Sequence, residues 1–314
     1  MAARSDIHSA RARIAPHILS TPVTFDERLG VWIKWESHQH TRSFKPRGAL
    51  NKVLGLSPAE LERGLLCASA GNHGQSVALA AQKVGGHVTV YVPESAPQIK
   101  IEKMLALSAE VVRVPGFFGD AEAAAICAAR EQGKTFVSPY NDWQIILGAG
   151  TLGLDLAEQC PQADRWLVPV GGGGLIMGMV IAAPPGVSVI GVQSEASAFL
   201  YEEFHHRDMS GVVEMPSLGD GLAGAVEPGS VTIEGIHTAA DVRLVTEPQI
   251  AEAIAYAYHI HGEVVEGSGA VVLAAVLSGQ LQGEGRTALA ITGGNIDPDK
   301  HRMLCEAYPA SLFH

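Results

Sequence analysis

The chain has 314 residues, of which 47% are hydrophobic and 18% are charged, and its formal net charge is −11. This length and hydrophobic content suit a soluble protein of about two lobes that share a large core. The acidic balance argues against nucleic acid and anionic membranes as partners. The four cysteines are widely spaced and form no CxxC pair, so we expect reduced thiols and no metal site built on them.

The N-terminal stretch, residues 1–19, carries charges throughout and lacks the apolar run of a secretory signal. We therefore expect a cytoplasmic protein. One uncharged stretch, Trp166–Val187, has the length of a membrane span, but it contains four consecutive glycines and three prolines. A spanning helix does not carry these residues unaided, so we interpret the stretch as a buried strand, a glycine loop and a short helix.

Short runs typical of β-strands alternate along the chain with apolar runs of helical length. The strand-like runs are Leu65–Ser69, Val88–Val92, Val111–Val114, Thr135–Ser138, Trp166–Val170, Val187–Gln193 and Thr287–Thr292. The helix-like runs are Gln75–Val84, Ile99–Leu107, Ala121–Arg130 and Pro248–Ile260. This alternation predicts βαβ units, and hence an α/β fold with largely parallel sheets. No linker or internal repeat appears, so a second lobe would have to be an insertion within the first.

The first segment with catalytic potential is Ser43-Phe44-Lys45-Pro46-Arg47. Most lysines are solvated surface charges, but Lys45 has a bulky aromatic residue directly beside it and a helix-like run that begins near Arg47. An apolar flank lowers the pKa of a lysine and makes its neutral amine available as a nucleophile and a base. Lys45 is therefore a candidate catalytic residue.

A turn of small residues follows the first strand-like run and precedes a helix-like run. Its residues are Ser69, Ala70, Gly71, Asn72 and His73. Such a turn leaves backbone N–H groups free at a helix N-terminus, where they favour a carboxylate. The amide of Asn72 could also bond an oxygen of a cofactor or a substrate. The alternative is an ordinary turn with a capping serine.

Two further glycine segments lie at the ends of strand-like runs. Gly171 to Gly174, followed by Leu175, form a loop whose successive N–H groups could make an anion nest, because glycine lets the backbone approach an anion closely. A flexible surface turn is the alternative, but the flanks are too apolar for the surface. Thr292 precedes two glycines at the carboxyl end of its run, where α/β sheets bind ligands.

The segment Gly148–Gly153 matches GxGxxG, the fingerprint of dinucleotide-binding proteins. If the run Trp143–Leu147 were a strand, a nicotinamide-dependent oxidoreductase would be an alternative function. The fingerprint expects an acidic residue about 20 positions further on, and the stretch Leu167–Gly171 has none. The sequence also lacks a GxSxG elbow and an HExxH motif, so we expect neither a serine hydrolase nor a metal site.

Together, the lysine segment, the asparagine loop, the tetraglycine loop and the Thr292 segment resemble the fold-type II pyridoxal-phosphate enzymes, specifically the threonine/serine dehydratase and serine racemase group. The resemblance runs from Thr21 to about Asp297. It implies a tryptophan synthase β-like fold of two αβα lobes with parallel-rich sheets. The large cofactor lobe would comprise residues 1–53 and 143–314, and the small lobe residues 54–142. Pyridoxal 5′-phosphate would be the cofactor, and a homo-oligomer is expected.

The resemblance also implies a role for each segment. The cofactor would contact Phe44, Lys45, Asn72, Gly171, Gly172, Gly173, Gly174, Leu175, Glu266 and Thr292. The substrate would contact Ser69, Ala70, Gly71, Asn72, His73 and Tyr140. In that group the matching lysine is the covalent anchor, the asparagine bonds O3′ of the cofactor, and the glycine loop cradles its phosphate. The hydroxyl at Thr292 would bond the pyridine nitrogen.

The function implied is an ammonia-lyase that converts L-threonine or L-serine to a 2-oxo acid and ammonia. The alternatives on the same scaffold are a serine/threonine racemase and a threo-3-hydroxyaspartate ammonia-lyase. Racemases of this group place a second serine in the asparagine loop, where this chain has Ala70, which favours elimination. Neither Phe117–Gly119 nor Pro139–Asp142 contains an Arg or Lys to pair a second carboxylate. Gln193 and Phe199 fall at the acidic positions of the racemase divalent-ion site, which predicts no metal.

Overall fold

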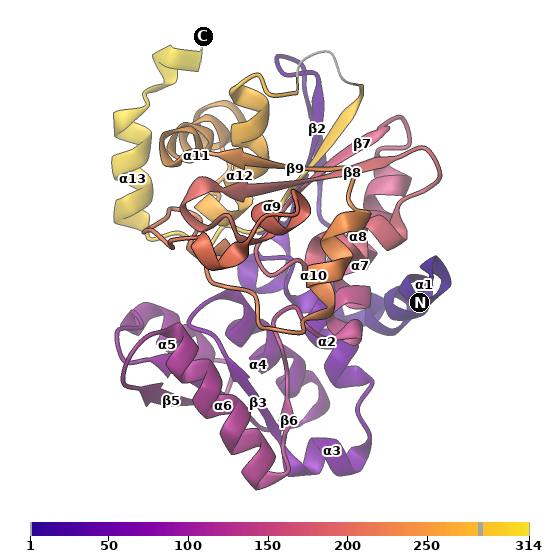
Figure 1. Ribbon diagram of the computed structural model, residues 1–314, viewed down its shortest axis with the longest axis vertical. Coiled ribbons are helices and arrows are strands. Elements are labelled where there is room, and N and C mark those ends of the chain that lie inside the picture. Colours follow the sequence, from indigo (N-terminus) through magenta and orange to yellow (C-terminus); the bar gives the residue numbers. More distant parts are fainter. Residues whose placement is uncertain (1, 282–284, 314) are drawn as a thin grey trace.

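The computed structural model describes residues 2–281 and 285–313, and their strands form two separate sheets. The larger sheet has six strands in the order β1-β2-β10-β7-β8-β9, and the smaller has four in the order β5-β4-β3-β6. Figure 1 shows each sheet in its own lobe, with the segments that connect the lobes between them. The predicted α/β fold of two lobes is therefore confirmed.

The large sheet consists of strands from both ends of the chain. They are β1 (Val23–Asp26), β2 (Val31–Trp35), β7 (Arg165–Pro169), β8 (Ser188–Ser194), β9 (Asp241–Val245) and β10 (Thr287–Ile291). Only the β1–β2 pair is antiparallel; each other neighbouring pair is parallel. Such a sheet is buried on both faces, which explains why its central strands read as unbroken apolar runs.

Helices cover both faces of the large sheet. On one face, α11 (Glu247–His261) and α12 (Gly267–Leu277) pack on side chains such as Leu167 and Leu289. On the other face, α7 (Trp143–Gln159) and α8 (Gly174–Ala182) pack on the adjacent residues of the same strands, Trp166 and Ala288. Adjacent residues of a strand point to opposite faces, so each strand contributes to both cores.

The small sheet is wholly parallel and comes from a single stretch of chain. Its strands are β3 (Leu65–Ala68), β4 (Val88–Pro93), β5 (Glu110–Val114) and β6 (Thr135–Phe136). Its helices are α3 (Pro58–Arg63), α4 (Asn72–Val84), α5 (Gln98–Leu105) and α6 (Phe118–Gln132), of which α4 and α6 contact β3 and β4. These elements lie inside the interval predicted for the small lobe, whose limits at residues 54 and 142 stay a prediction.

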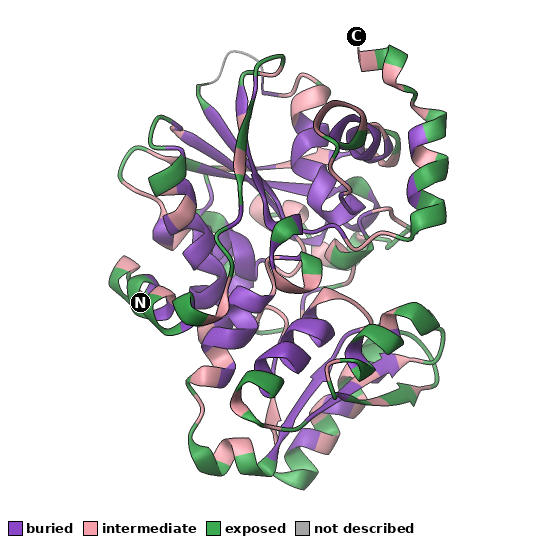
Figure 2. Ribbon diagram, turned by 180° about the vertical axis from the view of Figure 1, so that it is seen from behind, coloured by how far each residue is buried: buried purple, intermediate pink, exposed green. Residues whose placement is uncertain are grey.

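The remaining helices join the lobes or lie at the periphery. They are α1 (Arg4–Ile14), α2 (Pro46–Leu54), α9 (Phe199–Phe204), α10 (Val231–Gly235) and α13 (Pro298–Ala307). Figure 2 shows that buried residues concentrate in the strands and the helices against them, whereas α13 is largely exposed. No helix within residues 2–281 and 285–313 is long and apolar enough to cross a membrane.

One predicted alternative is wrong. Trp143–Leu147, considered as a strand, forms the start of α7, so the glycine pattern Gly148–Gly153 lies inside a helix and not in a strand-to-helix turn. These glycines serve close helix packing: a Cβ atom on Gly148 would lie 2.4 Å from the Arg47 carbonyl oxygen, and one on Gly150 would lie 2.6 Å from that of Gly178. The nicotinamide interpretation therefore loses its structural basis.

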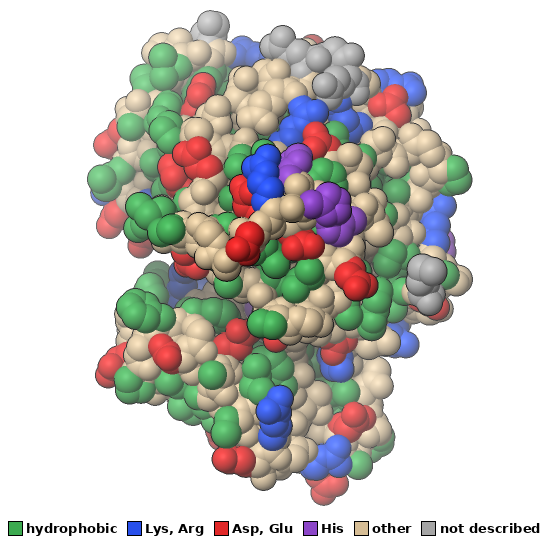
Figure 3. Space-filling view, in the orientation of Figure 1, with side chains coloured by type: hydrophobic (Ala, Val, Ile, Leu, Met, Phe, Trp, Pro, Cys, Tyr) green, Lys and Arg blue, Asp and Glu red, His purple; other side chains and the backbone are tan. Residues whose placement is uncertain are grey.

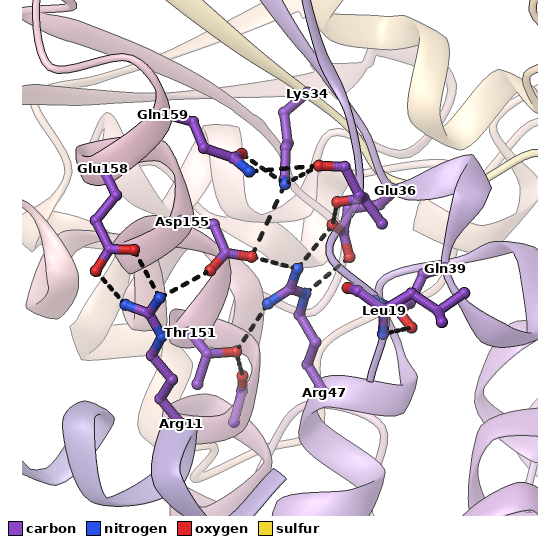
Figure 4. Close-up of polar contacts among 12 residues, drawn as sticks. Arg11, Leu19, Lys34, Glu36, Gln39, Arg47, Thr151, Asp155, Glu158 and Gln159 are labelled. Atoms are coloured by element: carbon purple, nitrogen blue, oxygen red, sulfur yellow. Dashed lines mark hydrogen bonds and ion pairs between the residues drawn. The ribbon is translucent and has the colours of Figure 1, made fainter. Parts of the chain in front are cut away.

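A buried ionic cluster, drawn in Figure 4, joins β2, α2 and α7. Arg47 is fully buried; its Nε donates to Glu36 at 2.8 Å, and its Nη2 donates to Glu36 at 2.9 Å and to Asp155 at 2.7 Å. Burial alone would raise the pKa of Glu36, but the charge and hydrogen bonds of Arg47 outweigh it and leave that pKa lowered. Because Arg47 lies in the first turn of α2, the cluster fixes the helix that Lys45 caps.

Candidate active site

Lys45 is the N-cap residue of α2, the helix that Figure 1 shows at the junction of the two lobes, and Pro46 begins this helix. Its Nζ donates to the carbonyl of Pro139 at 3.1 Å and lies 5.2 Å from the centre of the Phe44 ring. Burial lowers the pKa of Lys45 to about 8, although the nearby Glu266 carboxylate opposes this change. A larger share of neutral amine is therefore available near neutral pH than at an exposed lysine.

The backbone before Lys45 is tied to the end of β10. Ser43 forms a β-bridge with Gly293, and the N–H of Phe44 donates to the carbonyl of Thr292 at 3.0 Å. The chain enters this bridge through Thr41 and Arg42, whose φ angles are +56° and +53°. This contact brings the predicted lysine and hydroxyl segments together, although they are far apart in sequence.

The asparagine loop connects β3 to α4, as predicted. Ser69 Oγ accepts a hydrogen bond from the N–H of Gly71 at 3.0 Å, and no side chain of the described chain caps the start of α4. The His73 ring is buried and its Nε2 donates to the carbonyl of Val137 at 2.8 Å. Burial, with the charge of Lys45, lowers the pKa of His73 to about 3, so the ring is neutral. The backbone N–H groups of this turn, with the hydroxyl of Ser69, are therefore the donors left for a carboxylate.

The amide of Asn72 reaches across to the large lobe. Its Nδ2 donates to Glu266 Oε1 at 2.7 Å, and its Oδ1 accepts from Asn295 Nδ2 at 2.8 Å. Glu266 is the N-cap residue of α12. Burial raises the pKa of Glu266 to about 7; the charge of Asp220 adds to this, and the hydrogen bonds from Asn72 and Asn295 oppose it. This carboxyl group therefore changes protonation state close to neutral pH.

The tetraglycine loop connects β7 to α8 and has no room for side chains. A Cβ atom on Gly172 would lie 2.4 Å from the Tyr140 ring, and one on Gly174 would lie 2.9 Å from the Tyr140 carbonyl oxygen. Gly173 has φ +85°, in the left-handed region, and it precedes the first turn of α8. A bare backbone at a helix N-terminus suits a phosphate group.

Tyr140 connects the glycine loop to the lysine. It follows Pro139, whose carbonyl accepts from Lys45, and its hydroxyl accepts from the N–H of Glu227 at 2.9 Å. Its ring lies against the glycine loop, so the predicted contact with substrate stays a prediction. Leu175 lies in the first turn of α8 and its side chain is buried in the core, so only its backbone could face a ligand.

Two groups of this site were not predicted from the sequence: the carbonyl of Pro139 and the side chain of Asn295. Asn295 lies three residues after Thr292, and this proximity to a candidate site residue was the available signal. Figure 3 shows a groove between the lobes, at the left of the view. In the described residues no group of three or more His, Cys, Asp and Glu side chains is placed to hold a metal ion.

These features fit the requirements of pyridoxal phosphate. Lys45 offers a neutral amine for its aldehyde, the cradle at Gly171 to Gly174 suits its phosphate, and Asn72 offers an N–H for its phenolic oxygen. Thr292 follows β10 beside the lysine segment and offers a hydroxyl. Two αβα lobes with a lysine and an anion loop at their junction define a fold-type II pyridoxal-phosphate enzyme.

Comparison with known proteins gives the same class. The family model described as "Pyridoxal-phosphate dependent enzyme" matches residues 14–293, and the chain belongs to this family. It is 42% identical to the L-threonine ammonia-lyase of Thermotoga maritima over 85% of the chain and 67% of that protein. It is 36% identical to the catabolic L-threonine dehydratase TdcB of Escherichia coli K12 over 93% of the chain and 92% of that protein.

A solved structure shows the same fold over the whole chain. Maize serine racemase superimposes with a TM-score of 0.88 and 28% identity, covering 100% of this chain and 99% of that one. The predicted fold class and cofactor are confirmed, and so is the predicted enzyme class, a pyridoxal-phosphate-dependent ammonia-lyase. The roles of individual residues stay predictions.

Proposed function

We propose that this enzyme converts L-threonine or L-serine to the corresponding 2-oxo acid and ammonia. The observation that carries the proposal is the setting of Lys45, an amine of lowered pKa near a helix-start turn that suits a carboxylate and a glycine loop that suits a phosphate. The names of the two relatives above support threonine as a substrate.

Each group of the site has a task in this reaction. Pyridoxal phosphate, when bound, supplies an electron sink that acidifies the Cα–H bond of an amino acid attached to it. Lys45, once free and neutral, takes the Cα proton on its Nζ as the general base. The N–H groups at the start of α4 bind the substrate carboxylate and orient the amino acid for this transfer. Loss of the β-hydroxyl as water and hydrolysis of the product then give the 2-oxo acid and ammonia.

We also propose that the enzyme is a cytoplasmic homo-oligomer. All four cysteines are unpaired, which suits a reducing compartment. At the edge of the large sheet, Phe25 is 49% exposed and its ring lies 5.0 Å from that of Trp32, centre to centre. An exposed aromatic residue on the edge strand β1, in contact with a second aromatic on β2, favours burial against a second subunit.

A substrate comparison tests the proposed reaction. We expect kcat/KM to be highest for L-threonine or L-serine and lower by at least about tenfold for threo-3-hydroxyaspartate, because Phe117–Gly119 and Pro139–Asp142 contain no cation for a second carboxylate. Release of 2-oxo acid and ammonia measures each rate. A preference for hydroxyaspartate, or no ammonia release from any of the three, would refute the proposal.

Racemisation is the second candidate, because the structure of a serine racemase matches the whole chain. Racemisation needs a proton-transfer group on each face of Cα, and Lys45 serves one face. Ala70, in the asparagine loop, has only a methyl group, so unassisted return of the proton on its face would be about 10²–10⁴-fold slower.

We therefore expect L-serine to give pyruvate with little D-serine, as measured by chiral separation of the product mixture. Ala70→Ser is expected to gain D-serine formation while it retains the bound cofactor. If the unchanged enzyme formed D-serine as fast as pyruvate, the argument from Ala70 would be wrong.

A further inference from the structure

The amide of Asn72 is held by groups of the other lobe. Asn72 begins α4 of the small lobe, whereas Glu266 caps α12 and Asn295 follows β10, both in the large lobe. Asn295 contacts both partners of this pair. Its backbone N–H donates to Glu266 Oε2 at 3.1 Å, and its Nδ2 donates to Asn72 Oδ1 at 2.8 Å.

The direction of the Asn295 amide is fixed from both of its ends. A backbone carbonyl can only accept, and Nδ2 of Asn295 donates to the carbonyl of Thr41 at 2.7 Å. A lysine ammonium can only donate, and Lys103 Nζ donates to Asn295 Oδ1 at 3.1 Å. Neither contact survives if the amide is turned over, so Nδ2 must face Asn72.

This direction passes on to Asn72. Because Asn72 Oδ1 accepts from Asn295, its Nδ2 must point the other way, where Glu266 Oε1 accepts at 2.7 Å. One Nδ2 hydrogen is used by Glu266, and within the described chain that carboxylate is the one acceptor that the Asn72 amide reaches. The second hydrogen has no acceptor among the described residues and is free for an oxygen of a bound molecule.

We propose that Asn295 is a positioning residue that sets the Asn72 amide as a hydrogen-bond donor toward the cofactor. The proposal rests on the proposed function, because Asn72 matters only if the site binds pyridoxal phosphate. It also couples the lobes: the donor on the small lobe is correctly oriented only while the large lobe holds it.

An isosteric substitution separates orientation from packing. In Asn295→Asp the side chain keeps its shape but loses both Nδ2 hydrogens, so Asn72 must turn over to donate to the new carboxylate. Its Oδ1 then faces Glu266, and no donor is left for the cofactor. Asn295→Ala removes the contact without reversing it, so Asn72 keeps its hydrogen bond to Glu266.

The experiment compares these two variants with Lys100→Met in the cofactor-loaded enzyme. Lys100 is the control, because it lies on α5 of the small lobe and reaches the large lobe, at 3.3 Å from Asp220 Oδ2, without contacting Asn72 or Asn295. Its charge has the smallest of the effects on the pKa of Glu266. The readouts are the absorbance spectrum of the bound cofactor, its dissociation constant and kcat/KM. Thermal unfolding checks that each variant folds.

We expect Asn295→Asp to lower kcat/KM by about 10²-fold, weaken cofactor binding by about tenfold and shift the spectrum. Asn295→Ala should fall between it and Lys100→Met, which should stay within about threefold of the unchanged enzyme. A packing role predicts the opposite order, with Ala worse than Asp, and would overturn the proposal. So would an unchanged spectrum and affinity in Asn295→Asp.

Failure of the proposed function gives a different result. If the unchanged enzyme released no ammonia from threonine or serine, the spectrum and the dissociation constant would still report whether Asn295 sets the cofactor site. If Asn295→Asp failed to fold, Asn295→Ala would still test the proposal: an unchanged spectrum and an unchanged dissociation constant in Asn295→Ala would overturn it.

Discussion

Replacing Lys45 by alanine is expected to lower turnover by roughly 10⁴-fold or more, because one substitution removes both the covalent anchor of the cofactor and the general base. Steady-state release of 2-oxo acid measures the loss. Lys52→Ala is the matched control: Lys52 lies on the same helix, and its Nζ pairs with Asp142 at 2.6 Å, away from the amine of Lys45. Equal losses in the two variants would contradict the assignment.

The pH dependence of cofactor capture adds a second readout to this prediction. Only the neutral amine attacks the aldehyde, and burial lowers the pKa of Lys45 from 10.5 to about 8. The capture rate of cofactor-free protein should therefore rise with pH through about 8 and then level off. A rate that kept rising to pH 10 would indicate an exposed lysine.

The second large effect concerns the ionic cluster of Figure 4. Arg47→Met is expected to lower the free energy of unfolding by about 3–5 kcal/mol, because it leaves the fully buried Glu36 without its main partner. Denaturant unfolding measures the change. Arg11→Met is the matched control: Arg11 pairs with Glu158 at the surface, where such pairs contribute about 0–1 kcal/mol.

The same variant has a defined pH signature. With Arg47 present, the pKa of Glu36 is below its ordinary value of 4.5, so this pair stabilises the fold above that pH and the contribution is lost as pH falls through the lowered pKa. Without Arg47, burial acts against the charged carboxylate. The deficit of Arg47→Met should therefore be largest near neutral pH and shrink as pH falls toward 4.5. A deficit that did not change with pH would point to lost packing alone.

The strands with continuous apolar runs were predictable from the sequence, because burial on both faces of a parallel sheet leaves a simple signature. Three strands were not predicted. β2 (Val31–Trp35) contains Lys34, a charge that marks surface, yet Lys34 is fully buried and donates to the Thr21 carbonyl at 2.7 Å. β1 (Val23–Asp26) and β9 (Asp241–Val245) are edge strands, and their polar residues interrupt the apolar run by which a strand is predicted.

The candidate site also has a part that the sequence predicted and a part that it did not. The lysine segment, the asparagine loop and the glycine loop were predictable, because each is a short local segment of the sequence. The contact between Asn72 and Asn295 joins residues 223 positions apart and depends on how the lobes meet, which no local pattern records. Gly148–Gly153 shows the reverse case: glycines needed for close helix packing mimic a ligand loop.

The central claim is that Lys45 holds the cofactor, and chemical reduction tests it most directly. Borohydride converts the bond between cofactor and lysine to a stable amine, after which proteolysis and mass spectrometry locate the modified peptide. We predict a single cofactor adduct on the peptide that contains Lys45, accompanied by loss of the visible absorbance of the lysine-bound cofactor. An adduct on Lys34 or Lys52, or a protein that takes up no cofactor, would contradict the account.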